Sequence, residues 1–273
     1  MTINCKGELI DLSIPKVMGI LNLTPDSFYD GGKYSDGAAI VQQVARMLEE
    51  GATFIDVGGY SSRPGAKHIS VDEELQRVVP VIELLTKEFD GILISVDTFR
   101  SEVARAAVAK GAAMINDISG GSMDAAMFPL VAELQVPYIL MHMQGTPQTM
   151  QDKPVYEDIV TELVSFFAAQ LTQLRALKVH DVILDVGFGF GKTIQDNYEL
   201  LNNLNLFQKL DAPILTGVSR KSMLYKLLDS TPEQALNATT VANTIALMKG
   251  TQILRVHDVK EAMEAVTIYT QLK

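Results

Sequence analysis

The amino-acid sequence predicts a (β/α)8 barrel, an α/β fold in which eight parallel strands close into a ring inside a ring of helices. Three observations predict this fold. Short apolar runs alternate with longer segments of helical period along the 273 residues, there are eight such runs, and polar side chains follow nearly every run. An open, doubly wound sheet is the alternative, but such a sheet gathers its ligand groups at one topological switch point. The spread of polar residues over many strand ends therefore favours the barrel.

The apolar runs predict strands because each is too short for a helix and is bounded by turn residues or polar side chains. They comprise residues 16–21, 54–57, 92–96, 114–116, 138–141, 182–184, 214–217 and 252–256. The segments between them predict helices at residues 38–50, 71–88, 101–110, 157–177, 197–209, 232–249 and 259–272. Ser101 resembles a helix N-cap, and Gly111 marks the end of the same helix. Because no linker interrupts the alternation, residues 1–273 are predicted to form one domain.

Composition and charge exclude several classes of protein. The 33 acidic residues outnumber 23 basic ones, and the resulting net charge of −10 argues against a nucleic acid or an anionic membrane as partner. No apolar run reaches the roughly 18 residues of a membrane span, and the N-terminus lacks the pattern of a signal peptide. We therefore expect a cytoplasmic protein. Cys5 is the one cysteine of the sequence, so no disulfide within the chain is expected.

The polar residues at the predicted strand ends are the candidate functional residues. They are Asn22, Asp56, Asp97, Asn116, His142, Asp185, Ser219, Arg220, Lys221, Arg255 and His257. A single Asp after a strand is as often a turn or cap residue as a ligand contact, but polar groups after nearly every strand are unfavourable in a core unless they face a site. Asp97, Asn116 and Asp185 have the acceptors and donors to bind the amino-amide edge of a flat heterocycle. The cationic residues, Lys221, Arg255 and His257 with Arg63, could hold an anion.

Long loops follow the first two predicted strands, at residues 23–37 and 58–70, and a third candidate lid covers residues 142–156. Loops of this length in a compact domain are usually lids or binding loops. The run VGFGFGKT at residues 186–193 resembles a phosphate-binding loop, but Val186 stands where that motif needs Gly. We expect instead a loop at the barrel mouth, whose glycines let the backbone approach a ligand and whose Phe190 can stack on a ring.

Seven segments of the chain resemble bacterial dihydropteroate synthase. They are MGILNLTPDSFYDGG (18–32), DVGGYSSRPGA (56–66), SVDTFR (95–100), INDISGG (115–121), LDVGFGFGKT (184–193), GVSRKSM (217–223) and LRVHD (254–258). The resemblance runs in order over nearly the whole chain, and the SRPGA and SRKS segments together are its most specific part. It implies a sulfonamide-target transferase of folate biosynthesis that joins 6-hydroxymethyl-7,8-dihydropterin diphosphate to 4-aminobenzoate and releases diphosphate. It also implies Mg²⁺ with the diphosphate, and a homodimer formed through outer helices.

The resemblance carries roles onto individual residues. The residues implied to bind the pterin are Asp97, Asn116, Asp185, Lys221 and Phe190. Those implied to bind the diphosphate are Asn22, Arg63, Arg255 and His257, and Asn22 is also implied to contact the metal. For aminobenzoate they are Phe28, Ser62, Arg63, Pro64, Phe190, Lys221 and Ser222, and the implied catalytic residues are Lys221, Arg255, Asp97 and Asp185. Ser62 departs from the Thr that is usual in the family. It keeps the hydroxyl and loses a methyl contact.

Two other functions fit a pterin-binding barrel. A corrinoid-linked methyltransferase would use a methyl-folate and would not need the cations that are suited to a diphosphate. A non-catalytic pterin-binding protein would be expected to lack Asn22, Lys221 or Arg255, and this sequence has all three. Release of diphosphate that depends on aminobenzoate distinguishes the synthase from both alternatives.

Overall fold

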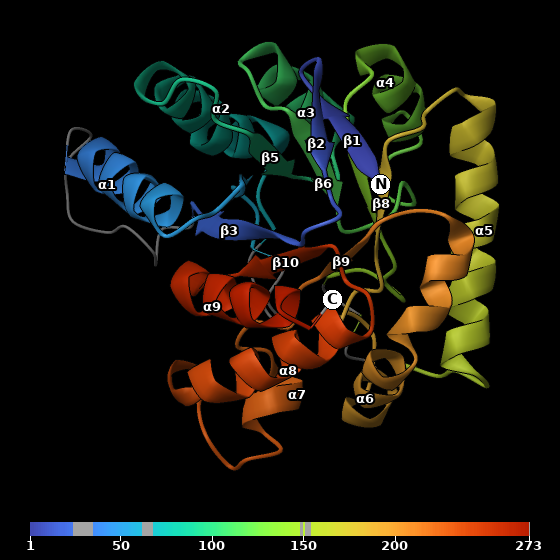
Figure 1. The fold of residues 1–273 in the computed structure, drawn as a ribbon. Coiled ribbons are helices and arrows are strands. Elements are labelled where there is room, and N and C mark those ends of the chain that lie inside the picture. Colours follow the sequence, from blue (N-terminus) through green and yellow to red (C-terminus); the bar gives the residue numbers. More distant parts are fainter. Residues whose placement is uncertain (24–34, 62–67, 148–149, 151–153, 273) are drawn as a thin grey trace.

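The computed structural model describes residues 1–23, 35–61, 68–147, 150 and 154–272. Its centre is a closed barrel of eight parallel strands, in the order β10-β3-β4-β5-β6-β7-β8-β9 (Figure 1). The strands are β3 (Lys16–Asn22), β4 (Phe54–Gly58), β5 (Ile94–Asp97), β6 (Met114–Asp117), β7 (Tyr138–Met141), β8 (Val182–Asp185), β9 (Ile214–Thr216) and β10 (Ile253–Val256). Each overlaps one predicted apolar run. The (β/α)8 prediction is confirmed.

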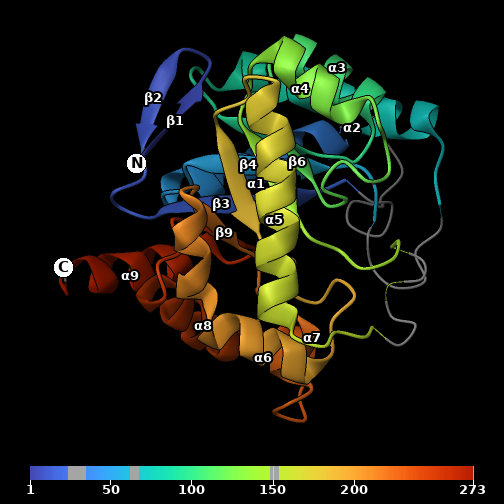
Figure 2. The same cartoon turned by 90° about the vertical axis from the view of Figure 1, so that its right-hand side faces the viewer.

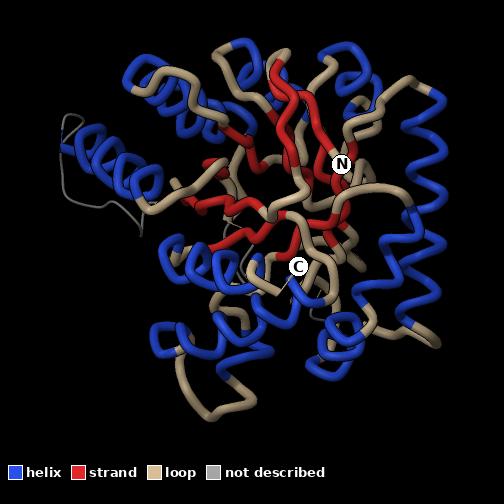
Figure 3. The backbone as a smooth tube through the Cα atoms, viewed as in Figure 1, coloured by secondary structure: helices blue, strands red, loops and turns tan. Residues whose placement is uncertain are grey.

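Helices surround the barrel on its outside (Figure 3). They are α1 (Ser35–Glu49), α2 (Val71–Glu88), α3 (Ser101–Ala109), α4 (Met127–Leu134), α5 (Ile159–Ala176), α6 (Ile194–Asn202), α7 (Ser222–Tyr225), α8 (Leu236–Met248) and α9 (Val259–Thr270). Two 3-10 helices, η2 (Leu204–Leu210) and η3 (Pro232–Gln234), divide what the sequence predicts as single helices at 197–209 and 232–249. No described helix is long and apolar enough to cross a membrane.

Two local expectations were wrong. Helix α4 is missing from the predicted helices, because its sequence MFPLVAEL is short and has too few polar residues to show a helical period. Ser101 is the first residue of α3 rather than its N-cap; Arg100 occupies the cap position without a side-chain cap bond. The backbone N–H of Ser101 instead donates to Asp124 Oδ2 at 2.7 Å. The start of α3 is therefore capped by the carboxylate of Asp124, 23 positions away, and not by the hydroxyl of Ser101 as the sequence predicts.

A hairpin that the sequence analysis missed closes the end of the barrel where the strands begin. Its antiparallel strands β1 (Thr2–Cys5) and β2 (Glu8–Asp11) lie beside the N-terminus (Figure 2). The Asn4 N–H donates to Asp181, the residue before β8, at 3.2 Å. The apolar side of the hairpin, Cys5 included, packs in one cluster with inward residues of the barrel. Burial raises the pKa of the Cys5 thiol to about 12, which fits a packing role rather than a nucleophile.

Side-chain alternation along the strands determines which residues face the barrel interior. Phe54, Met114, Ile183 and Ile253 belong to the cluster at the closed end, whereas Val57, Ile115, Leu184 and Leu254 belong to the outer core under the helices. Since side chains two positions apart share a face, the residues two positions after the inward ones also face inward. These are Asp56, Asn116, Asp185 and Arg255. The same rule applies to Asp97, because Ile94 and Val96 on its strand lie in the outer core.

Candidate functional site

The candidate site lies at the end of the barrel opposite the hairpin, where the strands terminate. Strand register places Asn22 beside Gly58, Gly58 beside Asp97, and Asp97 beside Asn116. The ends of four neighbouring strands therefore lie at one level of the barrel mouth. A Cβ at Gly58 would lie 3.3 Å from the Asp97 Cβ, so the glycine leaves room for the carboxylate in this row.

A four-residue cluster of two carboxylates, a guanidinium and an amide forms the centre of the site. The Arg255 Nε donates to Asp56 Oδ2 at 2.6 Å, and its Nη2 donates to Asp97 Oδ2 at 2.7 Å. The Asn116 Nδ2 donates to the same Asp56 oxygen at 3.0 Å. The Asp56 side chain is fully buried, and its Oδ1 has no hydrogen-bond partner among the described residues. Arg255 thus joins two carboxylates from different strands.

Asp56 is the member of this cluster to which the sequence analysis assigned no role. Its position at a predicted strand end was the signal in the sequence that could have indicated a role. The resemblance to the family assigned a role to Asp97 and not to Asp56. Arg255, which the resemblance implies at the diphosphate, has two of its nitrogens bonded to these carboxylates. Asp56 is therefore the residue that orients Arg255 and Asn116 together.

Burial changes the acid-base properties of the site. Burial raises the pKa of Asp97 to about 7, with Asp56 adding to the increase and Arg255 opposing it. Burial also raises the pKa of Asp185. On the cationic side, burial lowers the pKa of Lys221 to about 8 against the opposing charge of Asp185. The mouth of the barrel therefore holds charges that are poorly solvated, as is common at functional sites.

The raised pKa of Asp97 predicts a pH-dependent effect on stability. Its ordinary value is 3.8 and its folded value is about 7, so the folded state binds the proton more tightly than the unfolded state does. Ionised Asp97 therefore destabilises the fold above about pH 7, and this effect disappears as the pH falls below about 4. We expect Asp97→Asn, which cannot ionise, to raise the melting temperature by about 2–4 °C at pH 8 and by less at pH 5. Thermal scans at both pH values measure this, and an equal difference at the two would contradict it.

Lys221, Asp185 and Phe190 form a second group beside the cluster. The Lys221 Nζ donates to the Phe188 carbonyl and lies 4.2 Å from the centroid of the Phe190 ring, in a cation–π arrangement. Asp185 Oδ1 accepts from the Gly187 N–H at 2.8 Å. Both polar residues are thus bound to the glycine-rich loop that the sequence analysis placed at the barrel mouth.

The glycines of this loop face protein more than open space, which corrects the expectation that they approach a ligand. Gly187, Gly189 and Gly191 all have positive φ, where glycine is favoured. A Cβ at Gly187 would lie 2.0 Å from the His142 carbonyl oxygen, and one at Gly191 would lie 2.5 Å from the Gln144 carbonyl oxygen. Two of the three glycines therefore let the loop pack on the segment that follows β7.

Two further predicted residues lie at the last strands. His257 is exposed, and its Nδ1 contacts Ser219 Oγ at 3.0 Å. The Ser219 hydroxyl also accepts from the His257 backbone N–H at 3.2 Å, so the ends of β9 and β10 are joined here. Ser222 is half-buried and begins α7 directly after Lys221. The neighbouring Arg220 donates to both carboxylate oxygens of Asp258 and so is engaged in a partly buried ion pair.

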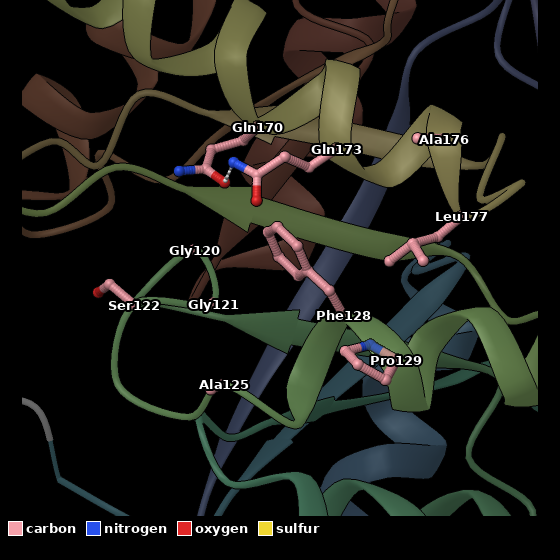
Figure 4. A pocket seen from close by; sticks show the side chains of 10 residues that line it. All are labelled: Gly120, Gly121, Ser122, Ala125, Phe128, Pro129, Gln170, Gln173, Ala176 and Leu177. Atoms are coloured by element: carbon pink, nitrogen blue, oxygen red, sulfur yellow. Dashed lines mark hydrogen bonds between the residues drawn. The ribbon is translucent and has the colours of Figure 1, made fainter.

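Four predicted site residues, Phe28, Ser62, Arg63 and Pro64, lie outside the described residues. Elsewhere, a groove of about 570 Å³ opens between α4 and α5 (Figure 4). Its lining includes Phe128, Pro129, Gln170 and Leu177, and none of the predicted site residues. The described part of the site is therefore the strand-end cluster with the glycine-rich loop.

Comparisons with known proteins agree on one family. Residues 18–257 match the family model described as pterin binding enzyme. The dihydropteroate synthase of Escherichia coli K12 is 45% identical over 98% of this chain and 95% of its own, and that of Haemophilus influenzae is 43% identical over 98% of each. The Yersinia pestis synthase, solved with a sulfonamide drug, has a TM-score of 0.93 at 43% identity over 100% of this chain and 99% of its own. The Xanthomonas albilineans synthase with 7,8-dihydropteroate has a TM-score of 0.89 at 38% identity over 100% and 98%.

Proposed function

Because the chain belongs to the dihydropteroate synthases, we infer that it joins 6-hydroxymethyl-7,8-dihydropterin diphosphate to 4-aminobenzoate to give 7,8-dihydropteroate. The observation that carries this function to the site is the buried cluster of Asp56, Asp97, Asn116 and Arg255 at the barrel mouth. Relatives solved with 4-aminobenzoic acid and with 7,8-dihydropteroate support the two organic ligands. The matches to synthases over the whole chain disfavour the methyltransferase alternative.

The proposed reaction begins with the departure of diphosphate. The C–O bond breaks with its electron pair on diphosphate, and the electron-rich dihydropterin carries the resulting positive charge. Asp97 and Asp185 would stabilise that cation because both are buried acceptors at the mouth. The amine of 4-aminobenzoate then forms the C–N bond and loses a proton to water. Since a neutral arylamine is already nucleophilic, we assign no strong general base.

The cations have separate proposed roles. Lys221, with its ammonium over Phe190, would reach the pterin and the adjoining aminobenzoate. Arg255 on β10 and His257 directly after this strand would face the departing diphosphate, together with Arg63. Phe28, Ser62, Pro64 and Ser222 are proposed to shape the aminobenzoate pocket. Orientation of the amine by these groups is expected to contribute more than proton transfer does.

Magnesium is proposed to accompany the diphosphate. Asn22 ends β3 on the inward face and offers an amide oxygen, the type of ligand that Mg²⁺ prefers. In the described part of the chain, no three His, Cys, Asp or Glu side chains are grouped as metal ligands. This donor set fits an ion that takes most of its ligands from diphosphate and water, as Mg²⁺ often does. Bound in that way, the ion would offset the charge of the departing diphosphate.

One assay tests the proposed function. The purified protein is given the pterin diphosphate with and without 4-aminobenzoate and Mg²⁺, and released diphosphate is measured together with 7,8-dihydropteroate. We expect equal amounts of both products, formed only when all components are present. Diphosphate release without aminobenzoate would indicate a hydrolase. Pterin binding without any turnover would indicate a non-catalytic binding protein.

A homodimer is proposed, with α8 in the interface. Val241, Ile245 and Met248 share one face of this helix and are 53%, 40% and 61% exposed. Such an apolar row on an outer helix favours a protein contact. Light scattering after size exclusion should give twice the 29.9 kDa of the chain, and Val241→Asp with Met248→Asp should give the chain mass. Leu9→Asp, which changes an apolar residue on the hairpin that is 68% exposed, should remain dimeric; a monomeric parent protein would contradict the proposal. The cytoplasmic location stays a prediction.

A further inference from the structure

We propose that Lys192 is a positioning residue for the synthase reaction: its buried ammonium joins the glycine-rich loop to the segment after β7 and thereby holds Phe190 and Lys221 in place. This lysine lies in the run VGFGFGKT, which lacks the first glycine of a phosphate-binding loop, and the proposed function gives it no task. The inference depends on the proposed function, since it concerns the geometry of the aminobenzoate side of the site.

The contacts of the Lys192 ammonium are all with protein acceptors. Its Nζ donates to the Phe190 carbonyl at 2.9 Å and to the His142 carbonyl at 3.2 Å. The third contact is His142 Nδ1 at 3.1 Å. Burial lowers the pKa of Lys192 to about 7, with the charge of Asp185 opposing the decrease. In its ammonium form Nζ can only donate, so Nδ1 is then the acceptor and the imidazole proton lies on Nε2. Three donors thus meet three acceptors.

The location of Lys192 excludes a phosphate-binding role. The residue is only 5% exposed, so its ammonium points into the protein and not toward the open mouth. A phosphate-binding lysine must leave at least one donor for the anion, whereas the three N–H groups here have partners in the two segments. Burial and the neighbouring Lys192 charge lower the pKa of His142 to about 3, which keeps this imidazole neutral as an acceptor.

The backbone packing of the two segments explains why a cation is needed between them. Gly187 and Gly191 bring the loop against the carbonyls of His142 and Gln144, so closely that no side chain fits. A buried carbonyl group is unfavourable without a hydrogen-bond donor. Lys192 supplies that donor for the carbonyls of His142 and Phe190.

The loop transmits this constraint to the reaction site. Phe190 carries both the carbonyl that binds Lys192 and the ring that lies 4.2 Å from the Lys221 Nζ. Lys221 in turn donates to the Phe188 carbonyl of the same loop. Loss of the Lys192 ammonium would therefore loosen the Phe190 ring and the support of Lys221. Lys192, Phe190 and Lys221 take no part in the hydrogen bonds among the four residues of the central cluster. Those hydrogen bonds should therefore persist; they join Asp56, Asp97, Asn116 and Arg255.

This separation predicts different effects on the two substrates. In Lys192→Met, which keeps the length of the side chain without its donors, we expect the KM for 4-aminobenzoate to rise about 10-fold, as for loss of one good hydrogen bond. The affinity for the pterin diphosphate, measured by calorimetry, should weaken less than the KM for 4-aminobenzoate rises, because Asp56, Asp97, Asn116 and Arg255 keep their contacts while only Phe190 and Lys221 lose support. Lys192→Gln retains an N–H donor and should recover part of the loss. Lys209→Met, at an exposed lysine of η2, is the matched control and should behave as the parent.

A second variant keeps the inference testable if the Lys192 variants do not fold. Tyr156 donates its hydroxyl to the Gly191 carbonyl at 2.7 Å, so Tyr156→Phe loosens the same loop from the other side. It should raise the KM for 4-aminobenzoate in the same direction. An unchanged KM in folded Lys192→Met, or an equal loss of pterin affinity, would overturn the inference. Absence of turnover in the parent protein would instead reject the proposed function. Failure of the proposed function is thus distinguishable from failure of the inference about Lys192, which is tested on an active parent protein.

Discussion

Arg255→Ala is expected to lower kcat/KM by at least about 1,000-fold and to destabilise the protein by about 3–5 kcal/mol, the range for removal of one partner of a buried ion pair. The reason is that Arg255 is bonded to Asp56 and Asp97 at 2.6 and 2.7 Å, and both carboxylates would remain in the barrel without it. Turnover is measured by diphosphate release, and stability by denaturant titration.

The destabilisation by Arg255→Ala should depend on pH. Protonation neutralises the carboxylates that have lost their cation, so the folded variant should bind protons more tightly than the unfolded chain does. The loss of stability should therefore be largest near pH 8 and smaller near pH 5. Arg105→Ala is the matched control, because Arg105 also binds a carboxylate with two nitrogens, but on the surface with Glu133. It should change neither turnover nor stability measurably, since exposed ion pairs contribute little. A similar loss in both variants would contradict the prediction.

Lys221→Met should separate turnover from stability. We expect kcat/KM to fall about 100-fold, the effect of losing one strong charged interaction with the substrates. Met preserves the stem of the side chain and its packing on Phe190, so the fold should persist. Turnover assays and thermal scans of the same preparation measure both effects.

The stability of Lys221→Met follows from the pKa of the residue. Burial lowers the pKa of Lys221 to about 8 from 10.5, so the folded state holds this proton less tightly than the unfolded state. The charged lysine therefore destabilises the fold below about pH 8, and this effect is lost as the pH rises toward 10.5. Lys221→Met should be at least as stable as the parent at pH 7, with the advantage shrinking at higher pH. Lys226→Met, at an exposed lysine five positions later, should alter neither property. A strongly destabilised Lys221→Met would show that the ammonium contributes to the fold.

The sequence by itself determined the strands of the barrel and the inward-facing residues at their ends. Both follow from local chemistry: short β-branched runs form strands, and a period of two places Asp56, Asn116 and Asp185 on the face of the buried residues before them. The motifs around these residues were also sufficient to indicate the family. The helix α4 and the N-terminal hairpin were not predicted because their hydrophobic patterns are short, and their stability depends on the barrel that they cover.

Only the tertiary structure decided which polar groups meet. Arg255 and Asp56 are 199 positions apart, and Lys192 and His142 are 50 apart, so no local pattern could pair them. No role was predicted for Lys192 from the sequence, whereas the packing of two loops gives it three protein acceptors. Closure of the ring brings the ends of distant strands to one mouth, and burial there requires that each charge find a partner. That requirement paired Arg255 with two carboxylates and Lys192 with two carbonyls and an imidazole, because an unpaired charge at this depth would destabilise the fold.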